Sequence, residues 1–172
     1  MFGWIIFHQH LGDSFNWNLP WADYKAGFGD ITSNFWLGLE RIHLLTNVQP
    51  YRLRMEMEQE SDGKWFTDEY WTFHIGDEPN DQYRLDVAGY SGDGGNSLQH
   101  PSNSNWMHDG MMFTTYDHDN SNSGTCGNSF GSWWFNGCYA VCLACNGAYH
   151  RSYVLPTDYL VNSRMMIKPR EM

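Results

Sequence analysis

The sequence predicts an α+β domain with a mixed, mostly antiparallel sheet, short helices and a loop-rich C-terminal lobe. Apolar and polar side chains alternate from Tyr51 to Glu58, which is the period of a half-buried strand. Asp62-Gly63 then supplies a turn, and a second strand pattern follows over Trp65–Ile75, so an antiparallel hairpin is expected. After Gly89 the regular pattern fades into a stretch rich in glycine, asparagine, serine and cysteine.

The first 48 residues carry both strand and helix signals. Trp4–Phe7 is a strand candidate, and Pro20 can begin a short helix over Trp21–Ala26 that Gly27 would end. Ser33 is placed to cap a second helix. The residues that this helix would carry on one face are Phe35, Leu39 and Ile42.

Two further strands are predicted, one marked by Tyr83, Leu85 and Val87 and a late one over Arg164–Lys168. The irregular stretch between them is long, and such segments are normally functional or held by metal ions and disulfides. We expect a single domain over residues 1–172. Its parts are an α/β start (1–48), a central sheet (49–89) and a loop-rich lobe with a closing strand (90–172).

Composition and charge exclude several classes of function. The formal net charge of -10 argues against a nucleic-acid partner, because phosphate contacts need clustered lysine and arginine. No run of 18 apolar residues occurs, so no membrane span is expected. The apolar start, Met1–Phe7, is too short for a signal peptide, which indicates either a cytosolic protein or a chain truncated at its N-terminus.

Four cysteines fall between positions 126 and 145, and four thiols allow three complete pairings. Disulfides in a loop-rich segment are typical of small extracellular folds. Zinc is the competing interpretation, because Cys142 and Cys145 have the two-residue spacing of zinc ligands. Cys126 and Cys138, however, do not form a second pair of this kind.

The segment from Asp117 to Gly124 alternates oxygen-bearing side chains with small residues. Such spacing lets one tight loop direct several oxygens at a hard cation, and calcium takes six to eight of them. An EF-hand does not fit, because no glutamate stands at the twelfth position and no flanking helices are predicted. The alternative is an ordinary surface loop of Asx turns.

Several motifs stand in an order that is typical of one family. His108–Asn120 reads HDGMMFTTYDHDN, and Gly131–Cys138 follows as GSWWFNGC. Supporting segments are WADYKAGFG (21–29), FWLG (35–38), GYSGD (89–93) and MIKP (166–169). Together they resemble the fibrinogen C-terminal (fibrinogen-related) domain family, which includes ficolin-, tachylectin-, angiopoietin- and tenascin-like domains, over nearly the whole chain.

The resemblance implies a secreted domain whose C-terminal lobe binds calcium. It places side-chain ligands on Asp119 and Ser121 and a further ligand near Ser123, with Asp117 just outside the ion or hydrogen-bonded to the site. Ser121 stands where the family usually has a second aspartate, and the stretch to Cys126 is one residue short. Both departures predict calcium binding that is weak or lost.

The resemblance also implies a Cys126–Cys138 disulfide. It gives Cys142 and Cys145 no counterpart, so a local disulfide, a disulfide to a partner chain and free thiols all remain open. Carbohydrate-binding members hold acetyl groups beside the calcium, using a histidine that is Tyr139 here and a cis peptide bond that falls on Gly137–Cys138. The candidate ligand-binding residues are Phe135, Gly137, Cys138, Tyr139 and Tyr149, with core packing as the alternative for the aromatic ones.

The preferred function is therefore a non-catalytic, lectin-like extracellular module that binds acetylated glycans in innate recognition or cell adhesion. Regions outside this chain would oligomerise it. The alternative is a protein-binding signalling or matrix module without a sugar pocket, which Tyr139 and the short C-terminal tail favour. A metal hydrolase is disfavoured, because the loop contains no glutamate and no histidine except His118, whose side chain is expected to point away from the cation.

Overall fold

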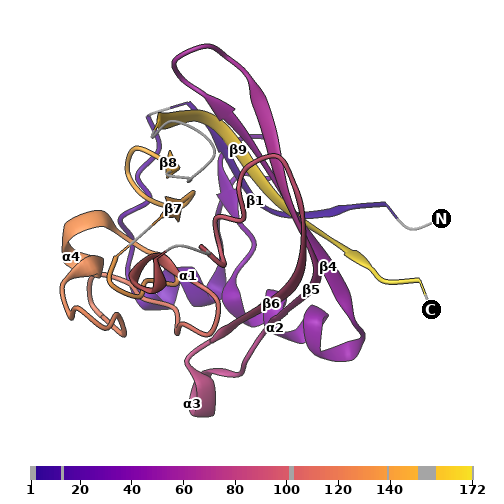
Figure 1. Ribbon diagram of the computed structural model, residues 1–172. Coiled ribbons are helices and arrows are strands. Elements are labelled where there is room, and N and C mark those ends of the chain that lie inside the picture. The colour runs from indigo at the N-terminus through magenta and orange to yellow at the C-terminus, as the bar shows by residue number, and fades with distance from the viewer. Residues whose placement is uncertain (1–2, 13, 101–102, 139, 151–157, 172) are drawn as a thin grey trace.

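Nine antiparallel-paired strands form the framework of the protein in a computed structural model that describes residues 3–12, 14–100, 103–138, 140–150 and 158–171 (Figure 1). The main sheet has the strand order β2-β3-β1-β9-β4-β5-β6, and β7 and β8 extend it beside β9. This architecture confirms the predicted fold class. The strands are β1 (Ile5–Leu11), β2 (Phe28–Gly29), β3 (Phe35–Trp36), β4 (Tyr51–Gln59), β5 (Trp65–Ile75), β6 (Leu85–Gly92), β7 (Val141–Cys142), β8 (Tyr149–His150) and β9 (Asp158–Pro169).

The central hairpin forms as predicted. In β4 the odd-numbered side chains are buried and the even-numbered ones are partly exposed, so the alternating sequence fixes the register against β5. The late strand β9 is longer than expected and lies between β1 and β4, where Ile167 pairs with both Ile5 and Leu53. The first and last strands of the chain are therefore neighbours, and the chain closes on itself through β9.

Within the described residues, four short α-helices and one 3-10 helix lie between the strands. They are α1 (Trp21–Ala26), α2 (Leu39–Val48), α3 (Glu78–Asp81), η1 (Ser104–Trp106) and α4 (Cys126–Phe130). None of the described helices is long and apolar enough to cross a membrane. The predicted bounds of α1 are confirmed. The prediction that Ser33 caps the second helix is wrong, because Phe35 and Trp36 pair with β1 as β3.

Helix α2 begins only after Gly38, which has a φ of 110°. A Cβ atom at this position would lie 2.8 Å from the carbonyl group of Ala26, so the close approach of α1 to the start of α2 requires glycine. Tyr83, predicted within the third strand, instead precedes β6 with a φ of 53°. Its hydroxyl donates to Glu40 of α2 over 2.6 Å, and its backbone N–H donates to the carbonyl oxygen of Asp77 over 3.2 Å instead of to β5.

The core is dominated by aromatic rings that join the sheet to the irregular lobe. Phe113 lies 5.0 Å from Trp134 and 5.2 Å from Tyr24, measured between ring centroids. Trp133 and Trp134 are fully buried. The indole nitrogen of Trp134 donates to the carbonyl oxygen of Tyr83 over 2.8 Å, so this large ring is buried without losing its hydrogen bond.

The buried side chain of His108 forms three hydrogen bonds to main-chain groups. Its Nδ1 donates to the carbonyl oxygen of Trp134 over 2.7 Å, and its Nε2 accepts from the N–H groups of Ala140 and Val141 at 3.1 and 3.3 Å. Because two N–H groups point at Nε2, the ring is held neutral with its proton on Nδ1. Burial lowers the pKa of His108 to about 4.

Replacing His108 with alanine is expected to reduce the free energy of unfolding by about 3 kcal/mol, because one buried carbonyl and two buried N–H groups lose their partner. Urea denaturation with the disulfides intact measures the loss. Ile31→Ala, at a position that is 78% exposed, is the control and should change stability by less than about 0.5 kcal/mol. Equal losses in the two variants would contradict the role given to His108.

Stability is also expected to fall as the pH falls from about 6.5 to 4. Burial, followed by the nearby charge of His10, lowers the pKa of His8 to about 3. Below pH 6.5 the unfolded chain therefore binds a proton that the folded chain does not, at a cost of about 1.4 kcal/mol per pH unit for each such histidine.

The difference in free energy of unfolding between the wild type and His8→Phe isolates the contribution of His8 to the pH dependence. His108, and Asp68, whose pKa is raised by burial, are present in both proteins, so their contributions cancel. That difference should shift against the wild type between pH 6.5 and 4 in a series of urea titrations. A difference that is independent of pH would show that His8 does not stay neutral in the fold.

Candidate functional site

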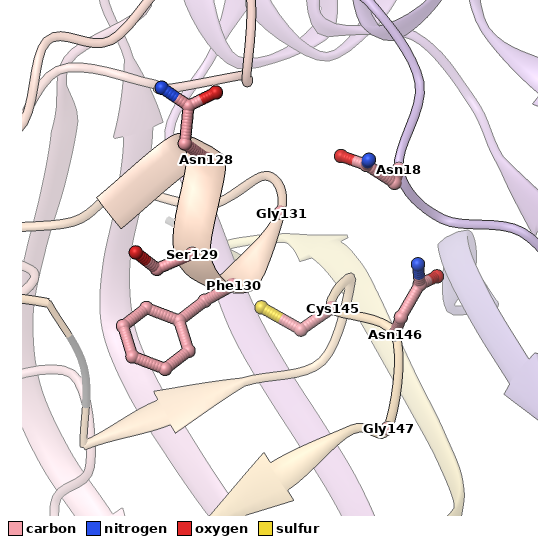
Figure 2. Close-up of a pocket in the computed structure, with 8 residues that line it drawn as sticks. All are labelled: Asn18, Asn128, Ser129, Phe130, Gly131, Cys145, Asn146 and Gly147. Atoms are coloured by element: carbon pink, nitrogen blue, oxygen red, sulfur yellow. The ribbon is translucent and has the colours of Figure 1, made fainter. Parts of the chain in front are cut away.

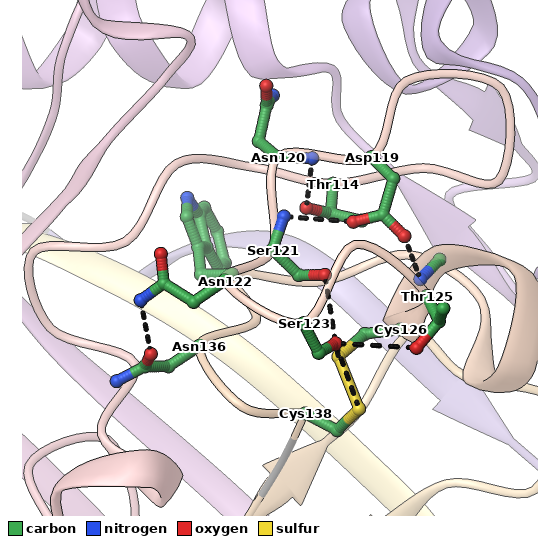
Figure 3. The surroundings of a disulfide bond; sticks show 12 residues. Thr114, Asp119, Asn120, Ser121, Asn122, Ser123, Thr125, Cys126, Asn136 and Cys138 are labelled. Carbon is green, nitrogen blue, oxygen red and sulfur yellow. Dashed lines mark hydrogen bonds between the residues drawn. A yellow bond between two sulfur atoms is a disulfide. The ribbon is translucent and has the colours of Figure 1, made fainter.

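The predicted calcium loop follows the buried segment Phe113–Thr115 and leads into α4 (Figure 3). Asp117 is directed away from the rest of the loop. One of its carboxylate oxygens accepts from the Thr115 hydroxyl at 2.7 Å and from the backbone N–H of Trp21, at the start of α1, at 2.9 Å. The bond to Trp21 anchors the loop to the N-terminal part of the chain.

The other three predicted ligands do come together. Asp119 accepts from the N–H of Ser121 on one oxygen and from the N–H of Gly127 on the other, both at 2.9 Å. The hydroxyl oxygens of Ser121 and Ser123 lie 3.3 Å apart, and that of Ser123 lies 2.8 Å from the sulfur of Cys126 (Figure 3). The loop thus brings one carboxylate and two hydroxyls to the base of α4.

This donor set can be compared with what calcium requires. All the side-chain donors are oxygens, which suits a hard cation, and each carboxylate oxygen of Asp119 retains a second lone pair. Only one negative charge converges, however, and the described part of the chain contains no group of three acidic, histidine or cysteine side chains placed to hold a metal. The ligand atoms are therefore of the type that calcium prefers, but a single carboxylate is the small negative charge of a weak calcium site.

Two disulfides follow the 117–125 loop in the chain. Cys126 and Cys138 are bonded, as the resemblance implied, with Cα atoms 5.2 Å apart. Cys142 and Cys145 form a local disulfide, which decides among the three possibilities left open by the sequence. All four thiols are paired, so no cysteine is left as a zinc ligand.

Three of the predicted ligand-binding residues, Phe135, Gly137 and Cys138, are fully described by the structure. Phe135 is fully buried in the core, which is the alternative role that the sequence allowed. Gly137 is exposed and donates its N–H to the carbonyl of Asn105, and Cys138 has a φ of 77°. The Gly137–Cys138 bond is trans, in contrast to the cis bond that the resemblance implied. Tyr139 and the side chain of Tyr149 lie outside the described residues, although the backbone of Tyr149 belongs to β8.

A pocket of about 210 Å³ opens instead between α4 and the turn after the second disulfide (Figure 2). Asn18 and Asn146 lie on one side of it and the residues of α4 on the other. Its lining is Asn18, Asn128, Ser129, Phe130, Gly131, Cys145, Asn146 and Gly147. The polar turn signals Gly127-Asn128-Ser129 and Asn146-Gly147 were visible in the sequence, but their proximity was not.

Several contacts fix the two walls of this pocket. Gly131 forms a bridge to Cys145, which ties the end of α4 to the disulfide-closed turn. The side-chain oxygen of Asn146 accepts from the N–H of Trp17 at 2.9 Å, so its amide nitrogen keeps its donors for another partner. The lining contains three carboxamides, a hydroxyl and a partly exposed phenyl ring, and it contains no charged side chain.

Comparison with known proteins places the chain in a family. A family model described as the fibrinogen beta and gamma chains, C-terminal globular domain, matches residues 1–160. The chain is 39% identical to human fibroleukin over 155 residues, covering 88% of this chain and 34% of fibroleukin. It is 38% identical to the human fibrinogen gamma chain over 165 residues, covering 87% and 36% respectively. It thus spans about a third of the length of these two relatives.

Solved structures agree with the sequence comparisons. The fibrinogen-like globe domain of human ANGPTL2 superimposes with a TM-score of 0.83 at 33% identity, covering 98% of this chain and 81% of that one. Lamprey fibrin D-dimer, complexed with the peptide ligand Gly-His-Arg-Pro-amide, gives a TM-score of 0.84 at 29% identity over 99% of this chain and 63% of that one. The buried tryptophan pair, the Cys126–Cys138 disulfide and these matches lead to one conclusion: the chain belongs to the fibrinogen C-terminal domain family.

Proposed function

We propose that this chain is the non-catalytic recognition domain of an extracellular protein and that its lobe pocket binds an uncharged, amide-bearing group. By lobe pocket we mean the cavity between α4 and the 145–147 turn. The observation that carries the proposal is its lining of carboxamides and an aromatic ring without charge. The relatives, fibroleukin and the fibrinogen gamma chain, support an extracellular location.

The first candidate ligand is the N-acetyl group of a glycan. Carboxamides donate and accept in one plane, so Asn18, Asn128 and Asn146 can hold both the N–H and the C=O of an acetamide. The ring of Phe130, which is 38% exposed, can pack against the acetyl methyl group. A pocket this small gives weak binding, which becomes useful when several copies are linked.

The second candidate is a peptide segment of a protein ligand. The lamprey fibrin structure that matches this chain holds a peptide, and peptide groups have the same N–H and C=O chemistry as an acetamide. A protein ligand would therefore use the lobe pocket for one of its uncharged peptide groups or amide side chains.

The contacts of the loop support a role in recognition and not in catalysis. The His118 ring stacks on Trp21 with centroids 4.3 Å apart, and Asp117 accepts from the N–H of the same Trp21. Asp117 and His118 are thus engaged with the start of α1, and the third acidic or basic group of the loop, Asp119, accepts from two backbone N–H groups. This arrangement suits a structural anchor better than a proton-transfer pair.

We propose further that the 117–125 loop binds calcium weakly and is held mainly by protein contacts. Asp119, Ser121 and Ser123 would be the residues nearest the ion, and a bound ion would supply charge neutralisation and further order to the loop. The hydrogen bonds of Asp119 to Ser121 and Gly127, together with the Cys126–Cys138 bond, close the loop without it.

Replacing Ser121 with aspartate is expected to tighten calcium binding by at least about tenfold, because it adds a second carboxylate to the converging oxygens. Isothermal titration with calcium chloride measures the change. Asn122→Asp is the matched control, since it adds the same charge on a side chain directed at Asn136. Tightening by both variants alike would indicate general electrostatic attraction and contradict the assigned ligand set.

Binding to N-acetylated glycans on an array, and to N-acetylglucosamine in titrations, is expected to fall at least about tenfold on Phe130→Ser or Asn128→Ala. Tyr116→Ser is the matched control, because Tyr116 on the same lobe is 39% exposed and does not line the pocket. Binding of displayed peptides with no acetylated glycan bound would select the second candidate. Binding of neither class would contradict the proposal.

A further inference from the structure

Three basic side chains gather at the end of the sheet where the last strand finishes. Figure 1 shows the C-terminus at this end of β9. Arg52 of β4 pairs in register with Lys168 of β9, and Arg170 follows two residues later. With the indole of Trp71 on β5 they line a hollow of about 240 Å³. Pro169 and Glu171 complete its lining. We call this the sheet-end basic site.

These cations form no ion pair in the part of the chain that the structure describes, although the carboxylate of Glu171 belongs to the same lining. The chain has 20 acidic and 10 basic side chains, so carboxylates are plentiful. Next along the same strands, Arg54 and Arg164 both pair with Glu56. Arg52, Lys168 and Arg170, by contrast, form no ion pair with the described residues. An unneutralised cluster in an acidic protein favours an external anion.

Indole rings hold the two guanidinium groups in place. Arg52 lies over Trp4 at 4.9 Å from the ring centroid, and Arg170 lies over Trp71 at 5.7 Å. Such contacts are attractive and restrict the arginine side chains before any ligand arrives. Since less side-chain freedom is then lost on binding, the site is partly preorganised.

Trp71 offers a surface of its own. It is 53% exposed, and its Cβ packs so closely on Gly89 that an added methyl group there would lie 2.8 Å from it. An exposed indole beside cations suits a ligand that alternates anionic groups with rings bearing C–H faces. The hollow is smaller than the roughly 300–1,000 Å³ clefts that enclose small molecules, so it fits one charged unit of a longer chain.

We propose that the sheet-end basic site binds a sulfated polysaccharide, with sulfate groups on Arg52, Lys168 and Arg170 and a sugar ring on Trp71. The choice of an extracellular polyanion rests on the proposed function. A peptide is disfavoured, because β4 and β9 are each paired on both sides and offer no free strand edge for main-chain hydrogen bonds. Side chains alone must then make the contacts, which suits a polymer of repeated charge.

The experiment is a titration of the full chain with a size-defined heparin oligosaccharide at low and at physiological salt. Arg52→Ala and Lys168→Ala are each expected to weaken binding about tenfold, since each removes a charge-assisted contact. Lys64→Ala is the matched control: it removes the same charge from an exposed lysine on the β4–β5 turn and should change affinity less than about twofold.

Two further variants distinguish loss of a binding contact from loss of folding. Glu171→Gln removes an exposed acid from the rim and should tighten binding, a gain that misfolding does not produce. Trp71→Ala should weaken binding to the sulfated oligosaccharide and leave the salt dependence unchanged, because it removes a ring contact and no charge.

Several results would contradict the binding of a sulfated polysaccharide at this site. Absence of heparin binding at low salt, equal loss in Lys64→Ala and Arg52→Ala, or tighter binding to a tyrosine-sulfated peptide or an anionic vesicle than to the oligosaccharide would each overturn the proposal. Undiminished binding of de-sulfated heparin would do so too. Because the lobe pocket shares no residue with this site, Phe130→Ser leaves heparin binding intact, and failure of one proposal is distinguishable from failure of the other.

Discussion

The imidazole of His108 lies in the C-terminal lobe, where few strands are available to form hydrogen bonds with the buried main-chain groups. One nitrogen donates to Trp134 and the other accepts from Ala140 and Val141, so a single ring pairs three buried main-chain groups. Buried N–H and C=O groups must find partners, and a lobe without a long ladder must find them in side chains. Ala140 and Val141 lie in the chain between Cys138 and Cys142, so the ring ties the segment between the two disulfides to the core.

Around His108 the lobe is closed by the same kind of contact. Asp119 caps the N–H groups of Ser121 and Gly127, and Asn120 donates to the carbonyl of Phe113. These hydrogen bonds join residues close together in the chain. The sheet, by contrast, is held by hydrogen bonds between strands and by the packing of apolar side chains on its inner face. The aromatic rings of Phe113 and Trp134 join the two halves, since each packs on both. Rigid loops of this kind can present a binding surface without regular structure beneath them.

The two proposed recognition surfaces differ in chemistry because they arise on different parts of this framework. The lobe pocket is built from turn residues, which are rich in asparagine and serine because those side chains satisfy backbone groups locally. The sheet-end basic site is built from the solvent face of strands, where long charged side chains alternate with the core. A neutral pocket and a cationic face can therefore coexist on a chain with a net charge of -10.

The local sequence pattern was enough to predict β4, β5 and α1. The alternation of apolar and polar side chains, and the effects of Pro20 and Gly27 on helix ends, depend only on residues close together in the chain. Motif order was enough for the family and for the Cys126–Cys138 bond. The start of α2, the outward turn of Asp117 to Trp21, the burial of Phe135 and the meeting of Asn18 with Asn146 required the tertiary structure. Each of these depends on contacts between segments far apart in the chain, such as the 96 positions that separate Trp21 from Asp117, and hydrophobic periodicity carries no information about which distant segments meet.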